Sequence, residues 1–450
     1  MNFTDLGFIF GFLPAVLILQ ELTVLRRYRI PILIVASLIF YMFSGLLHVV
    51  VLLLNIVSVY MFTASARTKG SVWRLTAAVA LPLASIFYFK YLNFFMSQIG
   101  LTPTPGIFKS EAALPAGISF FTFHMIAYAA DRYFGKIEKA PPFSFFALFI
   151  TFFPHLIAGP ILRFHDVAKA ITKLPSYRSL QSDRGIAISY FCVGLVLKIL
   201  LADPLGNIIA PLKKTLTSLD WTGQFFIIFG YSFQIYFDFF GYSLMAIGLA
   251  RWFGFIFPRN FDYPYESESP RAFWRRWHMT LSFWLRDYLY FPLGGNRAYV
   301  RNIIIVFLVC GLWHGAGWNF LLWGAFHACL VLGYAAVAPM WNAMPKLIQR
   351  SMTFILISVG WLLFQFDLSG VIQFFHAPSL SGTHGVYDLG SWLLLAMAAI
   401  VCFGFKLEPY IESQSKGYLR DGLLTITVAV LFVLSVMFAN QSNDFIYFRF

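Results

Sequence analysis

Long apolar runs recur along the whole 450-residue chain and constrain its fold more than any other feature. Many of them approach the roughly 20 residues that an α-helix needs to cross a bilayer. Hydrophobic residues make up 59% of the sequence and charged residues 12%, against roughly 25% charged in a soluble domain. A soluble core could not bury this much apolar surface. The sequence therefore predicts an all-α, polytopic membrane protein.

The apolar runs predict about eleven membrane-spanning helices and two shorter membrane-dipping stretches. The predicted spans are 7–24, 30–46, 48–64, 75–95, 114–131, 186–202, 223–250, 320–337, 352–367, 390–405 and 423–441. The dipping stretches lie near 143–162 and 302–313, and prolines at 154 and 160 favour re-entry of the first without a full crossing. We expect residues 1–450 to form a single integral-membrane domain.

Lys and Arg are distributed unevenly between the loops. Of the 33, 27 fall in 25–30, 65–74, 132–142, 163–185, 251–301, 338–351 and 406–422. The opposite loops hold only four, so the positive-inside rule places the first set in the cytoplasm and the tail 442–450 outside it. Membrane orientation thus accounts for the net charge of +13 without a nucleic-acid partner.

The cytoplasmic stretch 251–301 contains "SPRAFWRRWHMTLSFWLRDYLYFPLGG", which predicts an amphipathic helix starting at Ser269-Pro270 and ending at a turn over 292–295. Its apolar face carries Trp274, Trp277, Leu281, Trp284, Leu285 and Tyr288, and its basic face Arg271, Arg275 and Arg286, with His278 at the seam. It could lie at the interface, with its arginines on lipid phosphates. It could also form a basic mouth for a phosphorylated ligand, since guanidinium groups match phosphate geometry.

His314 is the most unusual of the nine histidines, because it stands in "CGLWHGAGWN" within an apolar run from Ile303 to Leu330. That run places it near mid-membrane, where an ionisable side chain is by default a functional-site candidate. Glycines at 311, 315 and 317 let backbone or substrate approach closely. The alternative is an inert histidine packed against Trp313 and Trp318. No metal site is predicted, because no carboxylate or second histidine lies at ligand spacing and no CxxC motif occurs.

Several long motifs in the chain resemble the membrane-bound O-acyltransferase family. They are "LPAGISFFTFHMIAYAADRYFGKIE", "FFPHLIAGPILRF", "YSFQIYFDFFGYSLMAIGLA", "NFDYPY", "SPRAFWRRWHMTLSFWLRDYLYFPLGGNR" and "RNIIIVFLVCGLWHGAGWNFLLWGAFHA". The branch they resemble contains bacterial alginate and peptidoglycan O-acetyltransferases. One departure is that Phe240 and Leu244 stand where the family pattern "FDFSGYSDMAIG" has Ser and Asp, so roles of those side chains do not transfer.

The resemblance implies a ring of tilted helices around a thin centre pierced by a funnel. It also implies acyl transfer from a cytoplasmic thioester to a hydroxyl reached from the other face. His314 matches the catalytic histidine of the family and His278 its second polar position, in the RRWH motif. A neutral imidazole is also the side chain best suited to take a hydroxyl proton near pH 7. Asp238, in mid-span, could orient a histidine or pair with an arginine, and we expect the structural pairing.

The expected donor is acetyl-coenzyme A, a substrate rather than a permanently bound cofactor. The residues predicted to bind it are Arg271, Trp274, Arg275, Arg276 and Arg286. We expect the protein in the bacterial inner membrane, serving O-acetylation of an extracytoplasmic polysaccharide such as alginate, cellulose or peptidoglycan. The aromatic tail "SNDFIYFRF" resembles the C-terminal motif of small proteins of the D-alanylation system, so Tyr447 is a candidate acyl relay to an SGNH-type or related secreted-side transferase. The alternative for the tail is an aromatic belt at the lipid boundary.

Other functions stay open on the sequence. A D-alanyl or other acyl transferase fed by a carrier-protein thioester is the main alternative within the family. A polysaccharide or lipid-linked sugar transporter would also have many spans, but it would not need His314. A non-catalytic membrane subunit that docks a secreted-side acetylase is the third alternative.

Overall fold

The computed structural model describes residues 1–65, 67, 69–101, 114–174, 181–376, 388–412, 418–439 and 442–446. These residues form helices and turns and contain no β-strand, which confirms the predicted all-α class. Contacts gather in two compact units. Unit 1 is Met1–Phe191 with Ser243–Pro258, and unit 2 is Cys192–Tyr242 with Arg259–Phe450.

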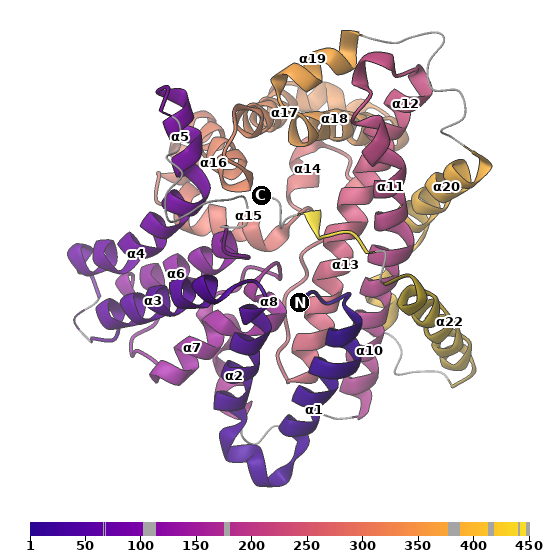
Figure 1. Ribbon diagram of the computed structural model, residues 1–450. Helices are drawn as coiled ribbons and strands as arrows, with labels where there is room; N and C mark the ends of the chain where they lie inside the picture. The colour runs from indigo at the N-terminus through magenta and orange to yellow at the C-terminus, as the bar shows by residue number, and fades with distance from the viewer. Residues whose placement is uncertain are drawn as a thin grey trace. The chain divides into compact units, whose positions relative to one another are not determined.

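Unit 1 is built from short, closely packed helices (Figure 1). They are α1 (Leu13–Glu21), α2 (Arg29–Met42), α3 (Leu46–Thr63), α4 (Val72–Ile86), α5 (Leu92–Gln98), α6 (Ile118–Tyr133), α7 (Phe143–Thr151), α8 (Phe153–Leu156) and α9 (Phe164–Lys173). Helix α6 is buried along almost its whole length. It begins after Gly117, whose φ of +73° and lack of a Cβ let the chain pass against the backbone of α8.

Two helices contribute residues to both units, namely α10 (Gln181–Val196) and α13 (Tyr231–Trp252). The other helices belong to unit 2. They are α11 (Asp203–Leu212), α12 (Trp221–Phe225), α14 (Pro270–Trp274), α15 (Met279–Leu285), α16 (Tyr299–His314), α17 (Trp318–Ala343), α18 (Lys346–Gln365), α19 (Leu368–His376), α20 (Leu389–Gly404), α21 (Leu407–Glu412) and α22 (Tyr418–Phe438). Helices α16, α17 and α18 follow one another as neighbours, and the short α14 packs on α17 and α18.

Seven helices in the described residues are long and apolar enough to cross a membrane, so the chain is a multi-pass membrane protein, but the predicted number of about eleven is not confirmed. They are Leu46–Thr63, Val72–Gln98, Asp183–Leu212, Trp221–Trp252, Gly295–His314, Trp318–Ala343 and Lys346–Gln365. Six of them match predicted spans. The seventh covers 302–313, which we expected only to dip into the membrane.

The remaining predicted spans differ for identifiable reasons. Helices Phe8–Glu21 and Val24–Met42, predicted as two spans, bend by 110° at their junction and form at most one broken span. Helix α6 has only 16 residues and is buried in protein, while Leu389–Gly404 and Ile426–Phe438 are short apolar helices. A long apolar run shows that a segment prefers an apolar environment, which either the lipid or the protein interior can provide. It does not by itself show that the segment crosses the membrane.

Candidate active site

Six of the predicted site residues line one cavity of about 260 Å³ in unit 2. The cavity lies among α14, α15, α16 and α17, and most of its lining is apolar. The six residues are Arg271, Trp274, Arg275, His278, Arg286 and His314. Arg276 is not among the residues that line it, and Tyr447 lies outside the described residues. The structure thus brings the two predicted histidines and three arginines to one opening.

His314 is the last residue of α16 and is 2% exposed. Its ring contacts Trp313, Trp323 and Phe364 edge-on, with ring centroids 4.7 to 5.2 Å apart. The chain turns at Gly315–Gly317 and enters α17, so the apolar run from Ile303 to Leu330 is two helices. His314 therefore lies at a helix-to-helix turn, between the predicted stretches 302–313 and 320–337, and its depth in the membrane stays a prediction.

The glycines around His314 allow helices α16 and α17 to pack closely against each other. A Cβ at Gly311 would strike the main-chain oxygen of Phe320 in α17, and one at Gly315 would strike the ring of Phe320. A Cβ at Gly324 would in turn meet the main chain of Phe307 in α16. These small residues let α16 and α17 approach closely, as in other membrane helix pairs. They fix the backbone that carries His314.

The predicted amphipathic helix after Ser269 is broken in the middle. Its start is confirmed, because Ser269 caps α14 and its hydroxyl accepts a hydrogen bond from the Ala272 N–H at 3.1 Å. Helix α14 ends at Trp274, however, and His278 adopts a left-handed conformation with φ of +44° before α15 begins. A residue in the left-handed region interrupts a right-handed helix, so the prediction of one continuous helix over this segment is wrong.

His278 is buried between α13 and α16. Its ring packs at 90° on Phe239, with centroids 4.6 Å apart, and lies 6.0 Å from the ring of Trp313. Its Nδ1 lies 3.0 Å from Oδ1 of Asn260. Burial lowers the pKa of His278 to about 3, so the imidazole is neutral near pH 7.

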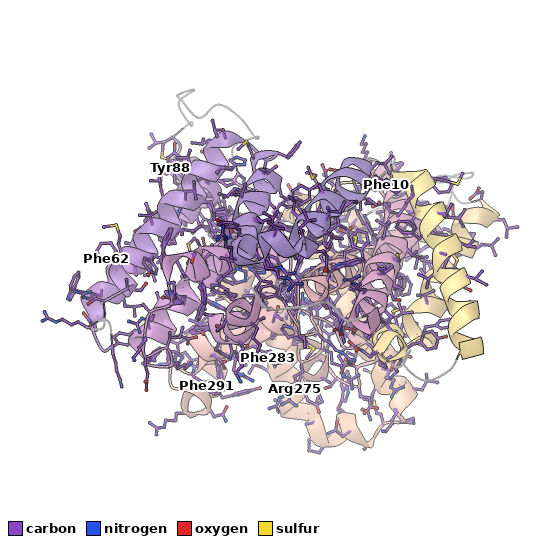
Figure 2. The ribbon with its side chains drawn as sticks, turned by 90° about the horizontal axis from the view of Figure 1, so that it is seen from below. Phe10, Phe62, Tyr88, Arg275, Phe283 and Phe291 are labelled. Atoms are coloured by element: carbon purple, nitrogen blue, oxygen red, sulfur yellow. The ribbon has the colours of Figure 1, made fainter. Side chains whose placement is uncertain are left out.

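The arginines at the cavity differ in their partners. Arg286 forms a close pair with the neighbouring Asp287, with Nε 2.7 Å from Oδ1, and it lies over the ring of Phe283. Within the described residues no carboxylate lies at salt-bridge distance from Arg271 or Arg275. Figure 2 shows Arg275 on the same side of the ribbon as Phe283 and Phe291. Two of the three arginines that line the cavity therefore offer uncompensated positive charge to an anionic group.

Arg271 and Arg275 also line a second, more polar depression, of about 250 Å³. Its other lining residues are Tyr334, Asn342 and Gln349 from α17 and α18, and Glu268, Ser269 and Ala272 at the start of α14. The carboxylate of Glu268 is paired with Arg350 at 3.1 Å and Lys346 at 3.5 Å. The same two guanidinium groups therefore stand between an apolar cavity that contains the histidines and a polar one. This arrangement matches a ligand with an anionic, polar end and an apolar, reactive end.

Asp238 is buried in α13 and pairs with Lys198, whose Nζ lies 2.7 Å from Asp238 Oδ1 and 2.6 Å from Asp203 Oδ1. The expected cation is thus a lysine and not an arginine. The second oxygen, Oδ2, accepts a hydrogen bond from the main-chain N–H of Ile446 at 2.8 Å. The carboxylate of Asp238 therefore binds two groups, the ammonium of Lys198 and the main chain of the C-terminal tail.

The described part of the tail, 442–446, folds back onto unit 2. Phe445 is 2% exposed and stacks on Tyr242 with ring centroids 4.5 Å apart. It also lies 5.7 Å from Phe239, the ring that packs on His278. The proposed relay at Tyr447 stays a prediction, because it lies outside the described residues.

Sequence reasoning assigned no role to Asn260, although it begins the "NFDYPY" motif. Its side chain is buried and contacts both His278 and Thr280. Tyr290, Asn296 and Tyr299 also line the cavity without having been singled out. These four residues lie apart from His278 and His314 in the sequence, so local spacing does not connect them to the site. The available sequence signal was an unusual feature, a polar residue such as Asn260 inside an aromatic stretch.

Comparison with known families and proteins agrees with the geometry. The model of the membrane-bound O-acyltransferase family matches residues 32–340, which include every described residue of the predicted site. The chain is 36% identical over 439 residues to the probable alginate O-acetylase AlgI of Azotobacter vinelandii, covering 90% of this chain and 85% of that protein. It is 34% identical over 520 residues to the peptidoglycan O-acetyltransferase of Helicobacter pylori, with 98% and 96% covered. The teichoic acid D-alanyltransferase of Streptococcus thermophilus is 32% identical over 259 residues, with 54% and 62% covered.

Proposed function

The chain belongs to the membrane-bound O-acyltransferase family and is an acyltransferase, and from this we propose that it passes acetyl groups from cytoplasmic acetyl-coenzyme A to the O-acetylation of an extracytoplasmic polysaccharide. Alginate and peptidoglycan are the polymers named for its relatives. The proposed location is the bacterial inner membrane. One observation carries the proposal: His278 and His314 line the same cavity as the uncompensated Arg271 and Arg275.

The proposed reaction is general-base catalysis at His314. The imidazole takes the proton of the acceptor hydroxyl, whose oxygen attacks the thioester carbonyl carbon. The carbon–sulfur bond breaks, and the thiolate leaves and receives the proton from the imidazolium. The aromatic rings around His314 keep water away from the thioester, which limits hydrolysis.

The proposed donor site uses the two cavities that share Arg271 and Arg275. The phosphates of coenzyme A would bind the guanidinium groups from the polar depression, and the thioester would reach into the apolar cavity past Trp274. Arg286 contributes less charge because Asp287 neutralises it. Arg276 is a weaker candidate for contact with the donor, because it does not line either cavity.

The proposed exit route runs through the C-terminal tail. The contacts of Phe445 with Phe239 and of Ile446 with Asp238 support a tail held near His278. In this proposal Tyr447 accepts the acetyl group and passes it to a separate SGNH-type or related transferase outside the membrane. Tyr447→Phe keeps the ring and removes the nucleophile, so it should preserve the amount of folded protein and abolish polymer acetylation. Wild-type acetylation in this variant would leave the tail with a structural role.

A D-alanyl or other acyl transfer from a carrier-protein thioester is the second candidate. The likeness to the teichoic acid D-alanyltransferase favours it over unrelated functions, although that match covers only about half of the chain. A carrier protein presents its thioester on the same phosphopantetheine arm as coenzyme A. The arginines therefore fit either donor.

Mass spectrometry of the surface polymers, with and without the gene, tests the proposed function. We expect loss of O-acetyl esters from one polymer and their return with the wild-type gene. Loss of D-alanyl esters would favour the second candidate. Unchanged acylation of every polymer would contradict an acyltransferase role in polymer modification.

A further inference from the structure

His278 is held in a backbone conformation that its residue type disfavours. Among the described residues only Tyr263 and His278 combine a side chain with a positive φ, of +47° and +44°. Such conformations cluster at functional sites, where surrounding contacts impose them. For His278 these contacts come from residues 260–262, which lie 16 to 18 positions earlier in the chain.

The segment around Asn260 runs beside the segment around His278. The main-chain N–H of Met279 donates to the Asn260 carbonyl oxygen at 2.9 Å. The Asp262 N–H donates to the Arg276 carbonyl oxygen at 3.0 Å. These two hydrogen bonds flank His278 and place its imidazole against the side-chain amide of Asn260, which is 1% exposed.

The amide oxygen of Asn260 is an acceptor for several donors. It accepts from the Thr280 hydroxyl at 2.9 Å and from the Thr280 main-chain N–H at 3.4 Å. Nδ1 of His278 lies 3.0 Å from the same oxygen, so Nδ1 must carry a proton to bond it. In a neutral imidazole the other nitrogen, Nε2, is then the acceptor.

We propose that Asn260 is a positioning residue that locks His278 as the neutral Nδ1–H tautomer, with Nε2 as the hydrogen-bond acceptor for an N–H or O–H of the acceptor other than the hydroxyl that reacts. This inference rests on the proposed function for its substrate. It assigns the two histidines different tasks, because His278 orients the acceptor through this second group while His314 removes the single proton of the reacting hydroxyl. A histidine with the opposite tautomer would present a donor at Nε2 and could not accept this hydrogen bond.

The chemistry of the site explains why an amide holds His278. A carboxylate in place of Asn260 would stabilise the imidazolium and raise its pKa by about 1–3 units. The titratable groups that share the cavity are the three arginines already described, Tyr290, Tyr299, Cys310 and His314, and its described lining includes no Asp or Glu. Phe239 and Trp313, which pack on the ring, are not titratable in this range. The surroundings therefore keep His278 neutral.

Asn260→Asp and Asn260→Ala separate positioning from a merely structural role. The test measures acetyl transfer from labelled acetyl-coenzyme A to polymer in membrane vesicles, as a function of pH. Asn260→Ala should lower kcat by about ten- to a hundredfold with little change in the donor KM, since the loss is in orientation of the acceptor. The carboxylate in Asn260→Asp can still accept a hydrogen bond from Nδ1–H, so kcat of this variant should return to the wild-type value above pH 8. Its acid limb should move upward by about 1–3 pH units.

Two controls assign the effects to His278. Thr280→Val removes a donor to Asn260 but keeps the Asn260–His278 hydrogen bond, so its pH profile should match that of the wild type. In the Asn260→Asp/His278→Gln variant the shifted acid limb should disappear, since the titrating group is gone. An unshifted profile in Asn260→Asp, or the same loss of kcat in the Asp and Ala variants at every pH, would overturn the inference.

A spectroscopic readout tests the tautomer without any activity. In protein labelled with ¹⁵N-histidine, the resonance absent from His278→Gln identifies His278. Its nitrogen shifts should show a protonated Nδ1 in the wild type and a tautomer mixture in Asn260→Ala. A protonated Nε2 in the wild type would refute the proposal, whereas a wild type that transfers no acetyl group would contradict only the proposed donor.

Discussion

Each unit of the molecule contains a pair of buried histidines, and the two pairs have different surroundings. In unit 1 the rings of His124 and His155 lie 4.9 Å apart at 87°. Each is bonded to the main chain: His124 Nε2 accepts from the Leu162 N–H at 3.1 Å, and His155 Nε2 donates to the Phe149 carbonyl oxygen at 2.7 Å. In unit 2, His278 and His314 line a cavity together with arginines.

The comparison teaches that burial does not distinguish a structural histidine from a reactive one. All four rings are at most 2% exposed. The hydrogen bonds of His124 and His155 join helix α6 and the turns around α8, and so hold the backbone of unit 1 together. His278 and His314 instead share a space that a substrate could enter. The predictions below test whether this difference holds, starting from the largest expected effect.

Replacing His314 by Ala should reduce polymer O-acylation by at least the ~10²- to 10⁴-fold that a general base contributes. The protein should still insert at normal levels, because the close contacts of α16 with α17 run through Gly311 and Gly324 and not through the His314 side chain. The measurement is the ester content of the polymer, normalised to immunodetected membrane protein. Near-normal acylation would show that the cavity pair is no more catalytic than the unit 1 pair.

Charge reversal by Arg275→Glu should raise the KM for acetyl-coenzyme A by about 10- to 100-fold, the value of one charge-assisted hydrogen bond to phosphate. Arg286→Glu is the matched control, and we expect a smaller rise because Asp287 already neutralises Arg286. Steady-state kinetics on purified protein distinguish the two. An equal KM for Arg275→Glu and wild type would contradict a donor site at Arg275 and favour contact of these arginines with lipid phosphates.

His155→Leu in unit 1 should lower stability while sparing catalysis. The substitution leaves the Phe149 carbonyl oxygen buried without its donor, at a cost of about 1–3 kcal/mol. Thermal unfolding in detergent measures the loss, and kcat per folded molecule should stay close to that of the wild type. A kcat loss as large as that of His314→Ala would break the distinction between the two pairs.

The pH dependence of stability near pH 7 should combine opposite contributions from the buried histidines and from a carboxyl group. Burial lowers the pKa of His155 to about 4 and that of His278 to about 3, so both are neutral in the folded protein near pH 6, where the unfolded chain binds protons at them. Their contribution to stability is therefore present above about pH 6.5 and is lost progressively as the pH falls below it. Burial raises the pKa of Glu408, in α21, to about 7. The folded protein therefore binds a proton there that the unfolded chain releases above about pH 4.5.

Stability from Glu408 is present at low pH and is lost as the pH rises through about 7, by on the order of 1 kcal/mol between pH 6 and 8. Glu408→Gln removes only this carboxyl contribution, so its stability at pH 8 relative to pH 6 should rise by about that amount compared with the wild type, as measured by thermal unfolding across that range. An equal difference in Glu408→Gln and wild type would show that Glu408 does not titrate there.

Several features of the site were predictable because they depend on local chemistry. The helix start at Ser269-Pro270 and the grouping of His278 with Arg271 and Arg275 follow from short-range spacing, and the structure agrees with both. The break at His278 was not predictable, because side-chain periodicity continues through it. Its cause is a left-handed residue stabilised by hydrogen bonds to a distant segment.

The predicted number of spans is not confirmed, for a related physical reason. Hydropathy measures the preference of a segment for an apolar environment, and the interior of a large membrane protein provides one without any lipid. Helix α6 shows this, since 14 of its 16 residues are buried in protein. Its apolar run is real, but its length is too short for it to count as a crossing helix.

The sequence by itself determined the class of the molecule and the distribution of its positive charge, and it marked His278 and His314 as candidate site residues, because hydropathy, charge and motif are sums over neighbouring residues. Only the tertiary structure decided which cation pairs with Asp238, which arginines at the cavity stay uncompensated and which side chain faces Nδ1 of His278. These depend on contacts such as Lys198 with Asp238 and Asn260 with His278. Such contacts arise when distant segments pack and exclude water, and no local pattern encodes their geometry.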